Sequence, residues 1–173
     1  MDGCSALTHA AYNSRMEILD LLISSGATLD LVDDHGRTPL LIAVSQGDVD
    51  VTTLLVQAGA SMNTSNTAGQ SSIHLGALAP SPELMQALLE PRRATGVSVA
   101  DLGIVGQDKY LQTPIHLAAA AGNTEVLRLL LAQSTAIEDR TAGLDLQDED
   151  QRTALMVASS LGHVDIVQAL IAA

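Results

Sequence analysis

Apolar and small residues recur along this chain in pairs of short helical stripes. The clearest first stripe lies between Thr113 and Gly122, where residues at i, i+3 and i+4 share one face of a helix: Ile115, Ala118 and Ala119. Thr113 and Pro114 suit the cap and the first turn of that helix, and Gly122 suits its end. A second stripe at helical spacing follows at Val126, Leu127, Leu130 and Leu131. The pattern predicts a short helix, a tight turn and a second short helix.

The same pattern recurs along the chain. Its five copies begin at Ser5, Thr38, Ser71, Thr113 and Thr153. The first two steps, 38 − 5 and 71 − 38, are both 33 residues, whereas 113 − 71 gives 42 and 153 − 113 gives 40. Five copies in register are a strong sign of a repeat architecture, in which each helical pair buries its apolar face against its neighbours.

A 33-residue period with the motif Thr113-Pro114-Ile115-His116-Leu117-Ala118 resembles the ankyrin repeat, and the resemblance covers essentially the whole chain. It implies an all-α solenoid of stacked helix-turn-helix units joined by hairpin loops. We expect a single domain over residues 1–173. Its repeats should span about 1–32, 33–65, 66–105, 106–147 and 148–173, the last one truncated inside its outer helix.

Three departures from the regular pattern are visible. Pro80-Ser81-Pro82 replaces the glycine between the two helices of repeat three, so its first helix should stop by Ala79 and its second should span 83–90. Insertions of about nine and seven residues fall within 92–103 and 132–143. Leu111 occupies the place of a hairpin glycine, equivalent to Gly36, which should adopt positive φ.

Nothing polar covers either end of the predicted stack, although repeat arrays normally need such a cover to stay soluble. We expect further chain or a partner to cover three apolar residues of the final helix: Ile166, Leu170 and Ile171.

The composition narrows the classes of partner. Apolar residues make up 47% of the chain, which is ample for a core, yet the only aromatic residues are two tyrosines. Twenty acidic residues against eight basic ones give a net charge of −12, which repels nucleic acids and anionic membranes. A single cysteine, Cys4, fits a reducing compartment, and we find no signal peptide and no membrane-spanning run. We therefore expect a cytoplasmic or nuclear protein.

Few residues are candidates for catalysis or for metal binding. The five histidines lie at positions without metal-ligand spacing: His9, His35, His74, His116 and His163. His74 and His116 occupy the histidine position of the motif, where a structural hydrogen bond is expected. Cys4 has no evident base, and the acidic run 145–150 lacks the glycine and terminal glutamate of a calcium loop. We predict no enzyme activity, no metal and no cofactor.

The resemblance implies instead a binding protein whose hairpin tips and first helices line a concave groove. The candidate partner-binding residues are Asp34, His35, Arg37, Gln46, Gln70, Lys109, Tyr110, Gln112, Glu149, Asp150 and Arg152. The acidic residues of the tips suggest a protein partner with a basic segment: Asp33, Asp34, Asp148, Glu149 and Asp150.

Two of these assignments have alternatives. Tyr110 is the favoured anchor because tyrosines are enriched in binding hot spots, but it could instead pack against the 92–103 insertion. Arg37 and Arg152 lie next to acidic residues and could form local ion pairs or orient an acidic group of a partner.

The sequence also leaves two other functions open. The chain could be a structural subunit or fragment of a large assembly, held by its ends and insertions, or a regulatory ankyrin domain attached to an enzyme elsewhere in a longer chain. Asn63 matches the hairpin asparagine that is hydroxylated in some ankyrin repeats, which makes it a candidate modification site.

Overall fold

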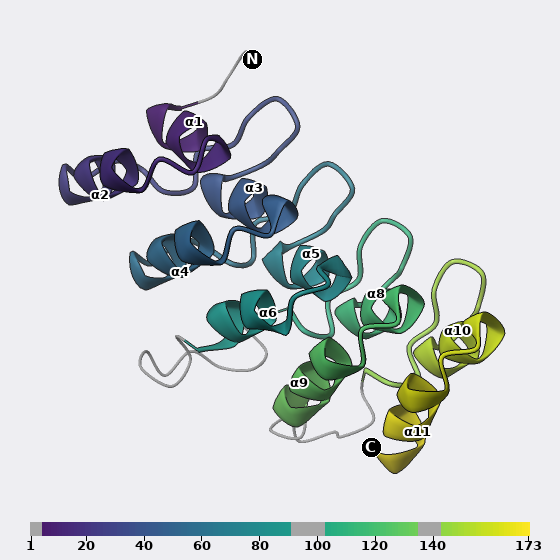
Figure 1. Cartoon of the computed structure of the whole chain (residues 1–173). Coiled ribbons are helices and arrows are strands. Elements are labelled where there is room, and N and C mark those ends of the chain that lie inside the picture. Colours follow the sequence, from purple (N-terminus) through teal and green to yellow (C-terminus); the bar gives the residue numbers. More distant parts are fainter. Residues whose placement is uncertain (1–4, 91–102, 135–142) are drawn as a thin grey trace.

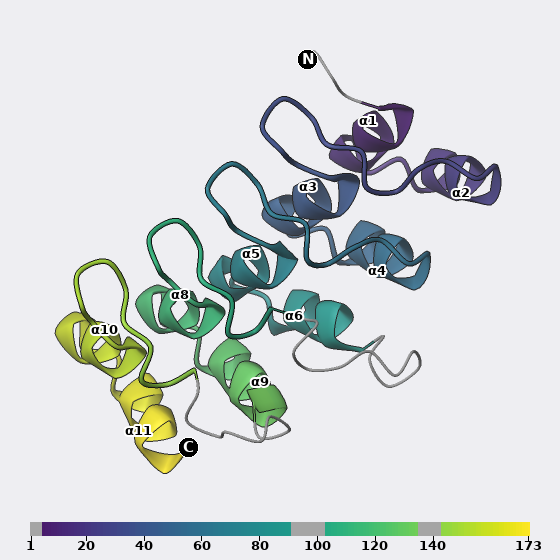
Figure 2. The same ribbon diagram turned by 180° about the vertical axis from the view of Figure 1, so that it is seen from behind.

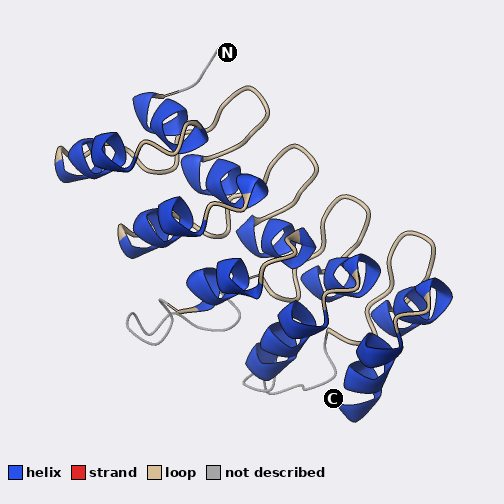
Figure 3. Ribbon diagram, in the orientation of Figure 1, coloured by secondary structure: helices blue, strands red, loops and turns tan. Residues whose placement is uncertain are grey.

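A computed structural model describes residues 5–90, 103–134 and 143–173. Within these ranges the secondary structure consists of helices arranged as five antiparallel pairs, without strands (Figure 3). The inner helices are α1 (Ala6–Tyr12), α3 (Pro39–Gln46), α5 (Ser72–Leu78), α8 (Pro114–Ala121) and α10 (Ala154–Leu161). The outer helices are α2 (Met16–Ser24), α4 (Val49–Gln57), α6 (Pro82–Leu89), α9 (Thr124–Ser134) and α11 (Val164–Ala172).

The five pairs stack in one row. Inner helices pack against inner helices, from α1 through α3, α5 and α8 to α10, and the outer helices α4, α6, α9 and α11 form a parallel row. Figures 1 and 2 show α1 and α10 at opposite ends of the stack, with the loops between repeats projecting to one side. The predicted all-α solenoid of helix-turn-helix units is confirmed.

The inner helices begin and end at the residues that the sequence predicts as caps. The hydroxyl groups of Thr38, Thr113 and Thr153 accept hydrogen bonds from the backbone N–H three residues on. At the C-terminal ends of α3, α8 and α10, glycines adopt the left-handed conformation: Gly47, Gly122 and Gly162. In repeat one the equivalent residue is Ser14, which takes φ of 52° without being glycine.

Repeat three ends its inner helix by another route. Helix α5 stops at Leu78 with Ala79 in an extended conformation, as the proline pair requires. The side-chain amide of Asn123, from the next repeat, donates hydrogen bonds to the carbonyls of Ala77 (3.2 Å) and Ala79 (2.9 Å). A neighbouring repeat thus supplies the C-terminal cap that the missing glycine cannot. The outer helix α6 begins at Pro82 and ends at Leu89, one residue earlier at each end than predicted.

Each outer helix carries a carboxylate in its first turn. The five residues are Glu17, Asp50, Glu83, Glu125 and Asp165. A negative charge there interacts favourably with the unpaired N–H groups and the positive end of the helix dipole. A quarter of the 20 acidic residues therefore contributes to helix stability, so the net charge of −12 is not by itself a sign of a basic partner.

The core is aliphatic and continuous through the stack. Among the described residues, one buried side-chain polar atom has no hydrogen-bond partner: the hydroxyl of Thr52 in α4, which is fully buried. The equivalent residues of neighbouring repeats are apolar and equally buried: Leu19, Met85 and Leu127. Thr52 thus places an unpaired hydroxyl at a position that elsewhere packs a hydrocarbon side chain.

Replacing Thr52 with valine is expected to raise the free energy of unfolding by about 1 kcal/mol, because valine keeps the shape and removes the unpaired hydroxyl. Chemical denaturation of both proteins measures this. Thr53→Val provides the control, since the Thr53 hydroxyl donates to the Val49 carbonyl at 2.7 Å. Equal effects of the two substitutions would contradict the prediction.

The expectation about the final helix is partly wrong. Ile166 and Leu170 are buried, with 0% and 8% exposure, because α11 packs against α9 and α10. Only Ile171 of the three is open, at 72% exposure. None of the described helices is both long and apolar enough to cross a bilayer. Cys4 lies outside the described residues, and so do residues 92–102 and 135–142 of the predicted insertions.

Candidate protein-interaction surface

Each loop that leads from one repeat into the inner helix of the next carries a tip, and the four tips have the same design. In the first tip, one carboxylate oxygen of Asp33 accepts hydrogen bonds from the backbone N–H groups of His35 (2.9 Å) and Arg37 (2.8 Å). The equivalent residues of the other tips make the same pair of bonds: Asn66, Asp108 and Asp148. We number the five positions of each tip from this residue, so that the first tip runs from position one at Asp33 to position five at Arg37. In every tip, the side-chain oxygen at position one accepts the backbone N–H groups of positions three and five and so stabilises the turn.

Neighbouring tips are joined by main-chain hydrogen bonds. The N–H of Thr67 donates to the His35 carbonyl at 3.2 Å, and the N–H of Lys109 donates to the Ala68 carbonyl at 3.0 Å. The N–H of Glu149 continues the series to the Tyr110 carbonyl at 3.1 Å. Because the backbone groups bond to one another, side chains at the second and third tip positions are left to face solvent.

The fourth tip position requires a left-handed backbone in every repeat. Gly36 and Gly69 adopt φ of 70° and 78° there. The positive φ expected at Gly36 is confirmed. Leu111 and Gln151 adopt φ of 57° and 60° at the same position although neither is glycine. An L-residue in this conformation costs about 1–2 kcal/mol, so the last two tips hold their shape against local strain.

Two buried histidines fix the tips to the inner helices. His74 accepts from the N–H of Ser71 through Nδ1, and its Nε2 faces the carbonyls of Gly106 (3.1 Å) and Gln112 (3.3 Å). His116 repeats this with Thr113 and the Arg152 carbonyl, 3.0 Å from Nε2. Since Nε2 faces carbonyls, it carries the ring proton. The predicted structural role of both histidines is confirmed.

Burial lowers the pKa of His74, although the charge of Asp108 and the two carbonyl partners oppose the shift. The ring therefore stays neutral in the folded protein at pH values where a free histidine is protonated. A neutral ring also suits the geometry, because protonation of Nδ1 would place a second donor against the Ser71 N–H. Both ring nitrogens of His74 are thus occupied by groups of the protein itself.

Asp33 and Asp148 are not available to a partner, which corrects the prediction that they form an acidic binding surface. They are 6% and 2% exposed. Burial raises the pKa of both carboxyl groups, but hydrogen bonds from the side chains and backbones of Arg37 and Arg152 outweigh this and leave each pKa below its usual value. Both residues therefore act as ionised turn formers inside the protein.

The two arginines form the local ion pairs that the sequence left as one alternative. Arg37 lies 2.8 Å from Asp33, and Arg152 lies 2.9 Å from both Asp148 and Asp150. Gln70 and Gln112, at the same tip position, are half-buried and bond within the tips through their backbone groups. The fifth tip position therefore serves mainly to hold the turn.

The remaining predicted binding residues lie on the surface. Second and third tip positions of three repeats hold exposed side chains in one row: Asp34, His35, Lys109, Tyr110, Glu149 and Asp150. Gln46 is exposed but lies at the other end of its inner helix, where its amide donates to the Tyr12 carbonyl at 3.0 Å. Asn63 is also exposed, and its modification stays a prediction.

Sequence reasoning missed one large apolar residue in the tips and another at the opposite end of an inner helix. Leu111 is 47% exposed next to Tyr110, which is 50% exposed, and Leu78 at the end of α5 is 45% exposed. The departure from glycine at position 111 was visible in the sequence and was the available signal. We define the tip surface as the exposed tip residues Asp34, His35, Thr67, Lys109, Tyr110, Leu111, Glu149 and Asp150.

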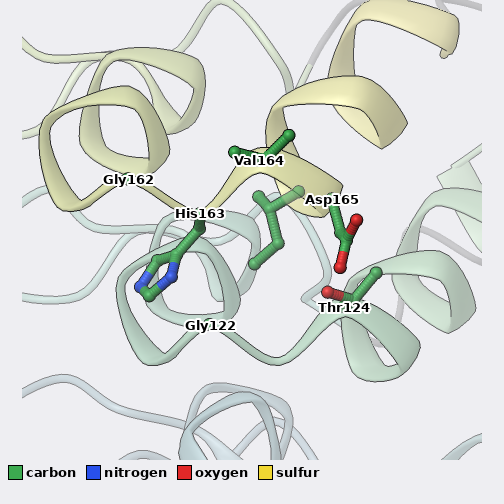
Figure 4. Close-up of a pocket in the computed structure, with 7 residues that line it drawn as sticks. Gly122, Thr124, Gly162, His163, Val164 and Asp165 are labelled. Carbon is green, nitrogen blue, oxygen red and sulfur yellow. The ribbon is translucent and has the colours of Figure 1, made fainter.

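An open cavity of about 300 Å³ lies where α9 and α11 begin, between the last two repeats. Figure 4 shows the His163 ring beside the turn at Gly122, and the Asp165 carboxylate facing the Thr124 hydroxyl. One histidine and one carboxylate do not make a metal centre, and the described residues hold no group of three or more potential metal ligands. The cavity lies at the junction of the last two repeats.

The fold and the tips together define a repeat protein of stacked helical pairs, in which buried histidines and aspartates hold the tips. The family model for ankyrin repeats (three copies) matches residues 1–66 and 73–173. The chain therefore belongs to the ankyrin repeat family. Ankyrin repeats are protein-interaction modules.

Similar curated proteins differ widely from one another. The chain is 26% identical over 178 residues to human transient receptor potential cation channel subfamily A member 1 (98% of this chain, 14% of that protein). It is 29% identical over 167 residues to the chicken nuclear factor NF-kappa-B p105 subunit (95% and 16%), and 33% identical over 192 residues to human neurogenic locus notch homolog protein 4 (99% and 8%). The chain thus spans less than a fifth of each of these relatives.

Proposed function

We propose that this chain is a non-catalytic module that binds a protein partner through the tip surface. The observation that carries the proposal is the row of tips itself, in which hydrogen bonds fix the backbone and leave side chains of several chemical types outward. Binding such a surface costs little ordering, because the tips are held in place before a partner arrives.

Within the tip surface, the centre of the contact is Tyr110 and Leu111. They are neighbouring large apolar side chains, each about half exposed, and Leu111 keeps its place despite an unfavourable backbone conformation. Strained residues of this kind often mark functional positions. The backbone N–H of Glu149 donates to the Tyr110 carbonyl, so an exposed acidic residue lies in the tip next to the apolar pair. We infer a partner segment with an apolar anchor residue and a basic residue next to it.

The experiment begins with a displayed library of peptides selected on the folded chain. For a selected peptide, Tyr110→Ala is expected to weaken binding about thirtyfold, the effect of losing a hot spot of about 2 kcal/mol. Tyr12→Ala is the matched control, since Tyr12 is the other tyrosine, is similarly exposed at 44%, and lies in the first repeat. Isothermal titration calorimetry gives both dissociation constants.

The second part of the experiment reverses two negative charges of the tip surface, with Glu149→Lys and Asp150→Lys combined in one variant. For peptides that carry Lys or Arg next to the anchor, we expect weaker binding and a smaller salt dependence. Peptides whose affinity survives both Tyr110→Ala and the charge reversal would show that the tip surface is not the binding site.

A further inference from the structure

Three prolines of the chain directly follow a hydroxyl-bearing residue, and the three hydroxyls have different surroundings. The pairs are Thr38-Pro39, Ser81-Pro82 and Thr113-Pro114. Thr38 and Thr113 begin inner helices, are 0% exposed, and use their hydroxyls to accept backbone N–H groups. Ser81 begins the outer helix α6 and is partly exposed, and within the described helix its hydroxyl caps no backbone N–H. Of these three described hydroxyls, that of Ser81 is therefore the one open to another protein.

The Ser81 hydroxyl bonds to a surface group in place of the helix. It donates to the Glu83 carboxylate at 2.6 Å, and Glu83 is exposed. Water can replace either partner of an exposed hydrogen bond at little cost in free energy. The fold therefore does not depend on this hydroxyl, in contrast to the hydroxyls of Thr38 and Thr113.

The backbone around Ser81 is already extended. Ala79 has φ of −69° and ψ of 137°, and Ser81 has φ of −95° and ψ of 117°. Pro80 and Pro82 hold the chain there, because a proline restricts the residue before it to extended conformations. An enzyme that reads a short segment of chain around a hydroxyl needs that segment extended. The segment at Ser81 meets this need with little further ordering.

The start of α6 also suits a negative charge on residue 81. The equivalent residue of repeat two is Asp48, which begins α4 and accepts the Val51 N–H through its carboxylate at 3.0 Å. Unpaired N–H groups and the helix dipole favour an anion at such a position. A phosphate on Ser81 would therefore stand where repeat two carries a carboxylate. The neighbouring Glu83 is exposed, so its side chain can turn into solvent.

From these observations we propose that Ser81 is a phosphorylation site for a serine/threonine kinase that selects a proline after its acceptor. The reaction forms a bond between Ser81 Oγ and the γ-phosphorus of ATP, and it breaks the bond from that phosphorus to the oxygen bridging it to the β-phosphorus. ADP leaves, and the hydroxyl proton passes to the catalytic aspartate of the kinase. Ser81 follows the C-terminal end of α5, whereas the tips precede the inner helices, so the site is separate from the tip surface.

The test uses the folded 173-residue chain with a purified proline-directed kinase, ATP and Mg²⁺. We expect one phosphate per chain, which fragmentation mass spectrometry should locate on Ser81. Ser81→Ala should take up none. Pro82→Ala keeps the hydroxyl but removes the proline, and it should also lose the reaction. Circular dichroism spectra equal to that of the unsubstituted chain show that both variants are folded.

Three synthetic peptides serve as matched controls, each with five residues on either side of one acceptor: 33–43, 76–86 and 108–118. They contain the same three pairs without the fold. The kinase should modify the peptide 76–86 and the folded chain at Ser81, and it should leave Thr38 and Thr113 of the folded chain unmodified. Three results would each contradict the proposal: a folded chain without phosphate, whether or not the peptide 76–86 is modified, phosphate on Thr38 or Thr113 of the folded chain, or undiminished phosphate in Ser81→Ala.

Discussion

Replacing Asp108 with alanine is expected to lower the free energy of unfolding by about 2–4 kcal/mol. Asp108 is 4% exposed, and one of its oxygens accepts the backbone N–H groups of both Tyr110 and Gln112 at 2.9 Å. Alanine would remove both bonds at once and leave the turn without its central acceptor. The measurement is equilibrium denaturation, with the midpoint and the slope compared between the two proteins.

Asp108→Asn is the matched control because the chain already uses this solution elsewhere. Asn66, in the preceding tip, accepts the N–H groups of Ala68 and Gln70 at 2.9 Å and 3.0 Å through its amide oxygen. Asparagine at position 108 should therefore cost less than about 1 kcal/mol. If asparagine were as damaging as alanine, the negative charge and not the acceptor geometry would be what holds the tip.

The sequence was sufficient for the architecture because each local signal had one consistent meaning. Thr113 with Pro114 could only open a helix, and Gly122 could only end it, and the structure places all three as expected. The 33-residue period then required the helical pairs to stack. Helix ends differed by one residue or so, as for α6, which spans Pro82–Leu89 instead of the expected 83–90.

The candidate surface was less accessible to sequence reasoning, because exposure depends on contacts between repeats. Asp33 and Asp34 are adjacent and chemically identical, yet Asp33 turns inward to two N–H groups while Asp34 faces solvent. Only the position within the tip separates them. The alternative placement of Tyr110 against residues 92–103 concerns a segment that is almost entirely outside the described residues.

Three positions with positive φ carry Ser14, Leu111 and Gln151 instead of glycine, and they show a second limit of sequence-based prediction. A sequence pattern assigns positive φ to glycine with ease, but these three residues adopt it because the surrounding repeats fix the backbone. Neighbouring tips bonded through their main chains can hold Leu111 in place, whereas an isolated turn would relax. Tertiary packing, not local preference, decides the conformation there.

Close stacking of the tips predicts a large effect for Gly69→Ala. A Cβ atom at Gly69 would lie 3.0 Å from the backbone nitrogen of Lys109, in addition to the strain of φ at +78°. Since the neighbour is backbone and cannot turn aside, we expect a loss of about 2–4 kcal/mol in the free energy of unfolding. Hydrogen exchange at the Lys109 amide should also accelerate, because its bond to the Ala68 carbonyl would be disturbed.

Gly26→Ala separates the two causes of this effect. Gly26 has nearly the same backbone conformation, with φ of +81°, but a Cβ atom there would meet nothing within 4 Å. Its substitution should cost only the conformational strain, about 1 kcal/mol. The difference between the two variants then measures how tightly one tip packs on the next. Equal losses would mean that the tips are not held together, and the preformed tip surface on which partner binding depends would lose its support.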